Sequence, residues 1–286
     1  MVYTSGNYIV SAFTSGVSVK EIYTNGVKVW PSGPGPGEYY VKWRPSSVSG
    51  SFIMGGETRL LQTYNGYYSG PFLSSNGVYY MDSQAFVGTG ITGVETNLPM
   101  VGGGAFTSVT TLQYARMSQC EQFGLRSDES YGTNVFFDCT SLNYLYLPKL
   151  KKIKYYTFTS CEHLQSINLP KCEAITMFGF ASCSNLIDIS LPECRLVGLG
   201  AFQGCSMLST ISLPVCSQIR QQAFENCTNL STIYLGYSGV VSFSTSWVHN
   251  TPIGAGNGSI YVPLEWVSEY KTGYPAYSSV IFPIPN

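Results

Sequence analysis

Nine cysteines are the residues of this sequence that most readily suggest chemistry, because thiolates form disulfides, bind zinc and act as nucleophiles. Two sets recur at a 22-residue spacing: Cys139, Cys161, Cys183, Cys205 and Cys227, and then Cys172, Cys194 and Cys216. No C-x-x-C pair occurs, and zinc would find only two histidines, His163 and His249. We therefore expect no metal site.

A regular column of single cysteines is typical of stacked repeats, where buried thiols act as small hydrophobic side chains. Stacking would bring neighbouring thiols to about 5 Å, which is within disulfide reach, but each thiol would then face two equivalent partners. We favour reduced thiols. Both histidines lie at positions that vary between repeats, and the acidic residues are scattered, so we predict neither catalytic residues nor a cofactor.

The cysteines belong to a 22-residue repeat that includes one aromatic and three aliphatic columns. These columns are Phe136, Phe158, Phe180, Phe202 and Phe224; Leu142, Leu164, Leu186, Leu208 and Leu230; Leu145, Ile167, Ile189, Ile211 and Ile233; and Leu147, Leu169, Leu191, Leu213 and Leu235. The I-x-L step has the period of a strand, and the proline that usually follows ends it. One coil cannot bury these side chains, whereas stacked coils make them a continuous core.

Upstream the repeat becomes irregular. Phe106, Leu112, Met117, Cys120 and Phe123 fit one more coil, followed by an eight-residue insertion around residues 124–131, and Phe86 with Leu98-Pro99 resembles a distorted copy. The sequence thus predicts a solenoid of 22-residue repeats with one short parallel strand per coil.

Side chains that flank the buried I-x-L positions must point outward, because successive strand residues face opposite sides. Two outward columns result, and we predict that they bind a ligand: Tyr144, Ser166, Asp188, Thr210 and Thr232, and Tyr146, Asn168, Ser190, Ser212 and Tyr234. Tyrosine with small hydroxyl groups on a rigid sheet suits recognition of sugars or proteins. A polar face without function is the alternative.

Charge is sparse and balanced, with 15 basic and 16 acidic residues, so nucleic acid is not an expected partner. The one concentration is the basic cluster Lys149, Lys151, Lys152 and Lys154, a candidate contact for an anionic glycan or partner, or else a solvated edge. We expect no membrane insertion, since no apolar run approaches the length of a membrane span, and no secretory signal at the N-terminus.

The ends of the chain differ from the repeats. Residues 1–30 predict a small β module with a hairpin at its end, in which Ile22 and Tyr23 precede an Asn-Gly turn and Val27, Val29 and Trp30 follow it. A hairpin is marginal alone, so we predict that these five residues anchor it to the solenoid, to copies of itself in a homo-oligomer, or to a larger assembly. Residues 31–37 form a Pro/Gly linker, 38–85 an irregular β region that caps the solenoid, 86–240 the repeats and 241–286 a C-terminal cap.

The repeats resemble the BspA-like, or treponemal-type, leucine-rich repeat, which carries an Ala-Phe pair, a cysteine, a leucine and an Ile-x-Leu-Pro strand. Residues 201–205 and 223–227, A-F-Q-G-C and A-F-E-N-C, show it most plainly. This chain differs in its second cysteine column, where Leu150 stands in the first coil. The resemblance implies a leucine-rich-repeat fold and a role in adhesion or interaction at cell surfaces.

The phrase I-Y-T-N-G-V-K-V-W-P at residues 22–31 also resembles short β modules in structural proteins of phages that infect gut bacteria. Together these features lead us to expect a non-catalytic phage virion fibre or decoration protein, assembled in the host cytoplasm. It would contact other virion proteins through residues 1–37 and present the solenoid to a host surface glycan or protein. A bacterial cell-surface adhesin is the alternative, and an intracellular interaction scaffold is a third possibility.

Overall fold

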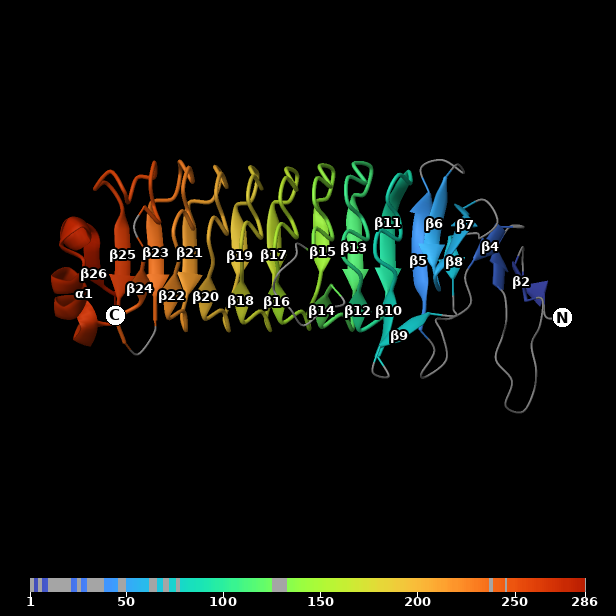
Figure 1. Ribbon diagram of the computed structural model, residues 1–286, viewed down its shortest axis with the longest axis horizontal. Coiled ribbons are helices and arrows are strands. Elements are labelled where there is room, and N and C mark those ends of the chain that lie inside the picture. Colours follow the sequence, from blue (N-terminus) through green and yellow to red (C-terminus); the bar gives the residue numbers. More distant parts are fainter. Residues whose placement is uncertain are drawn as a thin grey trace.

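The computed structural model describes residues 39–45, 50–61, 66–68, 72–75, 78–124, 133–236, 239–244 and 246–285, together with four strands nearer the N-terminus. The described chain is a stack of coils in which short strands lie side by side along one long axis (Figure 1). The solenoid expected from the repeat spacing is confirmed.

A row of strands, called here the first sheet, runs the length of the stack and contains the strand expected in each coil; its hydrogen bonds divide it into three consecutive sheets. Its members are β5 (Val41–Pro45), β8 (Tyr67–Tyr68), β11 (Ile91–Thr96), β13 (Tyr114–Met117), β15 (Tyr144–Tyr146), β17 (Ser166–Asn168), β19 (Asp188–Ser190), β21 (Thr210–Leu213), β23 (Thr232–Leu235), β25 (Ser259–Val262) and β26 (Ile281–Pro283). From β11 to β26 the paired neighbours are parallel, and in the regular coils each residue lies beside its counterpart one repeat later. In β15, β17 and β19 the strand stops before the Leu-Pro step, as proline requires.

Each coil also contains a second, shorter strand, which adds to the single strand expected from the sequence. The row of these strands, called here the second sheet, consists of two hydrogen-bonded sheets. The first contains β9 (Leu73–Ser75), β10 (Val78–Met81), β12 (Met100–Val101) and β14 (Gln122–Phe123), and the second contains β16 (Lys152–Ile153), β18 (Ala174–Ile175), β20 (Leu196–Val197), β22 (Gln218–Ile219) and β24 (Ser242–Phe243). From β12 onward these strands are two residues long, too short for an alternating pattern to identify them from sequence.

A column of phenylalanine rings fills the interior between the two sheets. Seven rings, from Phe86 to Phe224, stack with centroids 5.0 to 5.5 Å apart and planes within 13° of parallel, and all are fully buried. Phe52 extends this column to the start of the solenoid, 5.5 Å from Phe86. The distorted copy around Phe86 is therefore a coil of the same core.

All nine cysteines are buried and free. In the first column each thiol donates to the backbone carbonyl of the phenylalanine one coil earlier, as from Cys183 Sγ to Phe158 O at 3.1 Å. In the second column each thiol donates to the carbonyl two residues on, as from Cys172 Sγ to Ala174 O at 3.4 Å. Burial raises the pKa of the Cys172 and Cys183 thiols to about 12. The thiols are therefore placed as buried hydrogen-bond donors, and their reduced state stays a prediction.

The N-terminal end of the stack is closed by non-repeating strands. β5 pairs antiparallel with β11 and carries Trp43, whose ring lies 4.8 Å from Phe52 and 5.6 Å from Phe86. A hairpin of β6 (Ser51–Met54) and β7 (Glu57–Leu60) brings Phe52 and Met54 onto the same core. These contacts cover the first coil.

The C-terminal end is closed by η2 (Leu264–Trp266), α1 (Val267–Gly273), η3 (Pro275–Val280) and β26. Two tyrosine hydroxyls of this cap complete the edge of β24: Tyr270 accepts from Val241 N–H at 2.8 Å, and Tyr274 accepts from Phe243 N–H at 3.0 Å. Trp247 ends the phenylalanine column edge-on against Phe224.

The last strand of the first sheet, β26, has proline at its edge. Ile284 N–H bonds to Val262 O at 2.8 Å and so faces β25. Because N–H groups alternate between the two sides of a strand, residues 281, 283 and 285 face the open edge, and the last two are proline. These two positions offer no donor.

Nearer the N-terminus, β1 (Tyr3–Thr4), β2 (Asn7–Ile9), β3 (Ile22–Thr24) and β4 (Val27–Val29) form a four-stranded antiparallel sheet in chain order. Ile22 pairs with Val29, and Tyr23 with Lys28, as the Asn-Gly hairpin requires. Trp30, the linker at 31–37 and most of the insertion after Gly124 lie outside the described residues, and the anchor role stays a prediction.

Candidate binding face

The two outward columns lie on the solvent side of the first sheet, as the strand period predicts. In β15, β17 and β19 the central residue is buried and both flanking residues are exposed. Tyr144 is 49% exposed and Tyr146 is 38% exposed, while Thr232 and Tyr234 are half-buried. The register sets Ser166 beside Asp188 and Asn168 beside Ser190, while Thr210 lies beside Thr232 and Ser212 beside Tyr234. The geometry of the columns is confirmed, and their binding role stays a prediction.

The face continues toward the N-terminus through residues that the regular repeat spacing does not identify. Tyr114 pairs with Tyr144 and Arg116 with Tyr146, so both columns extend into β13. The two residues of each pair are separated in the sequence by one repeat plus the insertion. A comparison of the repeats that allowed for the insertion would have identified them. Beyond β13, Glu95 of β11 pairs with Lys42 of β5. The antiparallel strand β5 lies outside the repeat, and no spacing in the sequence identifies it.

Stacked contacts order the side chains of this extension. The Arg44 guanidinium lies 5.2 Å from the centre of the Tyr114 ring, and the Arg116 guanidinium lies 4.9 Å from that of Tyr146. Such contacts are favourable because the ring face is electron-rich. Partial burial raises the pKa of Tyr114, with Arg44 opposing the shift.

Gly93 makes room for Tyr114. A Cβ on Gly93 would lie 1.9 Å from Cε1 of Tyr114, so the ring occupies the space that any other side chain would fill. The absence of a side chain at this strand position therefore lets the Tyr114 ring lie against the sheet.

At the C-terminal end the face is aromatic. Tyr234 and Tyr261 stack with centroids 4.9 Å apart, and Phe282 follows 6.1 Å from Tyr261. A second aromatic pair, Tyr156 and Phe178, lies on the turns before the phenylalanine column, with rings 5.2 Å apart. Both of these residues have positive φ, which only glycine adopts freely.

The basic cluster forms part of a ladder of mixed charge on the edge of the coils. Lys149 donates to Gln119 Oε1 at 2.5 Å, and Lys151 forms an ion pair with Glu121 at 2.6 Å. The hydrogen bond to Lys151 lowers the pKa of Glu121. Lys152 is exposed in β16 and Lys154 is half-buried. Lys149 and Lys151 are thus engaged within the chain, and a partner for the cluster stays a prediction.

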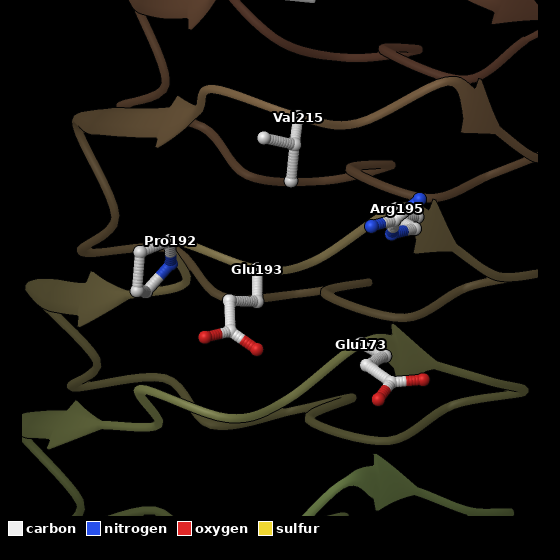
Figure 2. A pocket seen from close by; sticks show the side chains of 5 residues that line it. All are labelled: Glu173, Pro192, Glu193, Arg195 and Val215. Carbon is white, nitrogen blue, oxygen red and sulfur yellow. The ribbon is translucent and has the colours of Figure 1, made fainter.

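One shallow depression of about 400 Å³ lies on the same edge, lined by Glu173, Pro192, Glu193, Arg195 and Val215 (Figure 2). Glu193 forms an ion pair with Lys171 at 2.5 Å. Acidic and basic side chains alternate here between coils, an arrangement that joins neighbouring turns.

The histidines bond to neighbouring coils rather than to thiols. His163 Nδ1 is 2.6 Å from the carbonyl of Thr140, and His249 Nδ1 is 3.3 Å from Glu225 Oε1 on the exposed surface. Among the residues that the structure describes, no group of three histidine, cysteine, aspartate or glutamate side chains is placed to hold a metal ion. Over the same residues, no helix has the length and apolar character to cross a membrane.

Parallel coils of one repeat each, wound around columns of leucine, phenylalanine and cysteine, define a leucine-rich-repeat solenoid. Residues 129–251 match the family model of the BspA type leucine rich repeat region, in six copies. The resemblance drawn from the A-F-x-x-C motif is confirmed for this region. No curated protein matches the chain.

Among solved structures, the chain is similar to a leucine rich repeat protein of T. pallidum at 24% identity and a TM-score of 0.45, over 55% of this chain and 83% of that one. A leucine-rich repeat protein of Bacteroides ovatus matches at 19% identity and 0.41, over 68% and 63%. A leucine rich cell surface protein of Faecalibacterium prausnitzii matches at 20% and 0.42, over 72% and 55%. The chain spans less than two thirds of these last two proteins.

Proposed function

We propose that this is a non-catalytic binding protein that presents the outward face of its first sheet to a glycan or protein on a cell surface. The observation that carries this proposal is the continuous face itself, with Tyr144 and Tyr146 exposed beside the outward serine, asparagine and threonine side chains. The match of residues 129–251 to the BspA type repeat supports it.

The solenoid suits such a role because its face is rigid. Strand pairing fixes the backbone, and the stacked phenylalanines fill the interior behind it. A tyrosine that binds from a rigid strand loses little conformational freedom, since its ring has only two rotatable bonds.

For the place of action we infer a phage virion, in which the protein is a fibre or decoration protein attached to other virion proteins through residues 1–37. Nine free, buried thiols support folding in a reducing compartment such as the host cytoplasm. A bacterial cell-surface adhesin is the alternative, and the BspA type repeat is equally compatible with it. An intracellular scaffold is the third candidate.

Binding is tested with fluorescent protein on intact bacteria. We expect the triple variant Tyr144→Ala, Tyr146→Ala, Tyr234→Ala to lose binding while it keeps its circular dichroism spectrum and unfolding temperature. The matched control is Gln218→Ala with Ser242→Ala, two exposed positions of the second sheet. Equal binding by the folded triple variant and the control would remove this face as the binding site.

The place of action is tested by the DNA that flanks the gene and by deletion of residues 1–37. Portal, capsid or lysis genes nearby, and particles that lack the truncated protein, are the results expected of a virion component. Secretion or housekeeping genes would favour the adhesin. Incorporation of a truncated protein that still folds would refute the anchor.

A further inference from the structure

One end of the binding face carries a group of stacked aromatic and basic side chains, which we call the aromatic-cationic patch: Lys42, Arg44, Tyr114, Arg116, Tyr144 and Tyr146. The patch spans the adjacent strands β5, β11, β13 and β15. The hydroxyl-rich strands β17, β19 and β21 follow directly along the solenoid (Figure 1). The patch is therefore a distinct region of the face rather than a repeat of it.

The two arginines of the patch are positioned by rings rather than by acids. Arg44 lies over Tyr114 and Arg116 over Tyr146, at 5.2 and 4.9 Å. Among the described residues, neither guanidinium has an ion pair or a side-chain hydrogen bond. Both are exposed. Each therefore offers its planar set of N–H donors to a ligand while stacking restricts its motion.

The charge of the patch is positive. Lys42, Arg44 and Arg116 outnumber Glu95, the acid that lies between Lys42 and Arg116 in the register. Lys42 is also held by a ring, 5.0 Å from the centre of Tyr40. A chain with a net charge of −1 thus concentrates positive charge on part of its binding face.

We propose that the aromatic-cationic patch binds a carboxylated carbohydrate, a glycan that contains uronic or sialic acid. The proposal rests on the function proposed above and names the ligand class for this end of the face. Guanidinium groups match carboxylates through two parallel hydrogen bonds. The exposed tyrosines offer apolar ring surface and phenol hydroxyls, and Glu95 accepts hydrogen bonds from sugar hydroxyls.

The dimensions of the face suit an extended chain of sugars. Five strands from β8 to β15, at about 4.8 Å per strand, give a platform roughly 19 Å wide. Lys42 and Arg116 lie two strands apart in one column, and so about 10 Å apart. The patch can therefore contact two anionic groups on one ligand, which multiplies the contribution of each contact.

A single-stranded nucleic acid fits the patch less well. Such ligands stack their bases on free aromatic faces along a continuous positive groove. Here the guanidinium groups cover one face of Tyr114 and of Tyr146, and the Glu95 carboxylate interrupts the positive column. The observations therefore favour the carbohydrate.

The experiment measures dissociation constants of the full chain for four probes: polygalacturonate, polysialic acid, neutral dextran and oligodeoxythymidine. We expect binding to at least one carboxylated probe, weakening as salt rises, and none to dextran. Arg44→Gln and Arg116→Gln should each weaken this binding about 10-fold to about 100-fold, the loss of a charge-assisted hydrogen-bonding group. Arg116→Lys keeps the charge but loses the planar guanidinium group, and should restore only part of the affinity that Arg116→Gln loses.

The matched control is Arg220→Gln, an exposed arginine outside the first sheet. It should bind as the parent does, and circular dichroism with thermal unfolding confirms that every variant is folded. Preference for polygalacturonate or for polysialic acid identifies the sugar acid.

Tighter binding of oligodeoxythymidine would overturn the proposal in favour of nucleic acid, and equal losses in Arg116→Gln and Arg220→Gln would overturn the assigned site. Failure of both carboxylated probes, while labelled protein still binds bacteria through Tyr144 and Tyr146, would overturn this inference alone. Failure of both assays would also overturn the proposed function.

Discussion

Alkaline pH should unfold this protein through its buried thiols. Burial raises the pKa of the Cys120, Cys139, Cys172 and Cys183 thiols from 9.0 to about 12 and that of Cys216 to about 11. It also raises the pKa of Cys161, Cys194 and Cys205. In the unfolded chain all of these thiols titrate near the ordinary value.

Below pH 9 both states hold these protons, so titration of the thiols does not change stability there. Above pH 9 the unfolded state loses protons that the folded state keeps, and unfolding becomes more favourable as pH rises. At pH 10 each thiol with a folded-state pKa of about 11 or about 12 contributes about 1.4 kcal/mol in this direction. For these five thiols this reaches roughly 7 kcal/mol, comparable with the whole stability of an ordinary domain.

The assay is urea unfolding followed by circular dichroism at half-unit steps from pH 7 to pH 11, with a phosphine reductant present. We expect a level midpoint to pH 8.5 and a steep fall from pH 9 upward.

The control for the thiols is Cys183→Ala. Its free energy of unfolding should be lower at pH 7, but its slope against pH above 9 should be shallower by about 1.4 kcal/mol per pH unit, because one titrating thiol is gone. Equal slopes in the parent and the variant would refute this reasoning. So would thiolate absorbance that appears near pH 9 in protein that is still folded.

Three further predictions concern single contacts. Phe180→Ala removes a fully buried ring between Phe158 and Phe202 and should lower the free energy of unfolding in urea by about 3 to 5 kcal/mol. Ile187→Ala, at a side chain that is 49% exposed, should change it by less than about 0.5 kcal/mol. Similar losses in both variants would contradict the core assignment. Tyr270→Phe leaves the buried Val241 N–H without its acceptor. Amide hydrogen exchange around residues 241–243 should therefore become about 5-fold to about 150-fold faster, while exchange in the coil of Phe180 stays unchanged. Uniformly faster exchange along the chain would argue against a local cap. Gly93→Ala should displace the Tyr114 ring, visible in a crystal structure of the variant, and lower the unfolding free energy by about 1 to 3 kcal/mol; an unmoved ring would show that the strand shifts instead.

Most of the fold could be predicted from the repeat spacing, because each column position has the same environment in every coil. Cys183, Phe180 and Ile189 meet their counterparts one repeat away, so periodicity in the sequence becomes adjacency in space. The second sheet was not predicted, because its regular strands, such as the one that contains Ile175, have only two residues and cannot show an alternating pattern. The two caps were expected as regions, residues 38–85 and 241–286, but their contacts were not, because Trp43 and Tyr274 act through contacts that occur only once.

The residues of the candidate site likewise divide into those that the repeat predicts and those that it does not. Tyr144, Tyr146 and Ser190 follow from the strand period, and Tyr114 and Arg116 were within reach of the repeat once the insertion is allowed for. Lys42 and Arg44 were not, because they reach the face on an antiparallel strand that no repeat predicts. The ligand proposed for the face rests on the chemistry of these side chains, which the spacing does not encode.

The two prolines at the edge of β26 have a consequence for how such molecules associate. A stack of parallel coils is a template, since the free edge of its last strand can accept the first strand of another molecule, and repeated addition would give filaments. Pro283 and Pro285 remove two of the three donors that residues 281–285 would present at the C-terminal edge, and only Ile281 keeps an N–H there. Addition of another molecule at this edge is therefore disfavoured, and the number of coils can change without loss of this protection as long as the cap is kept.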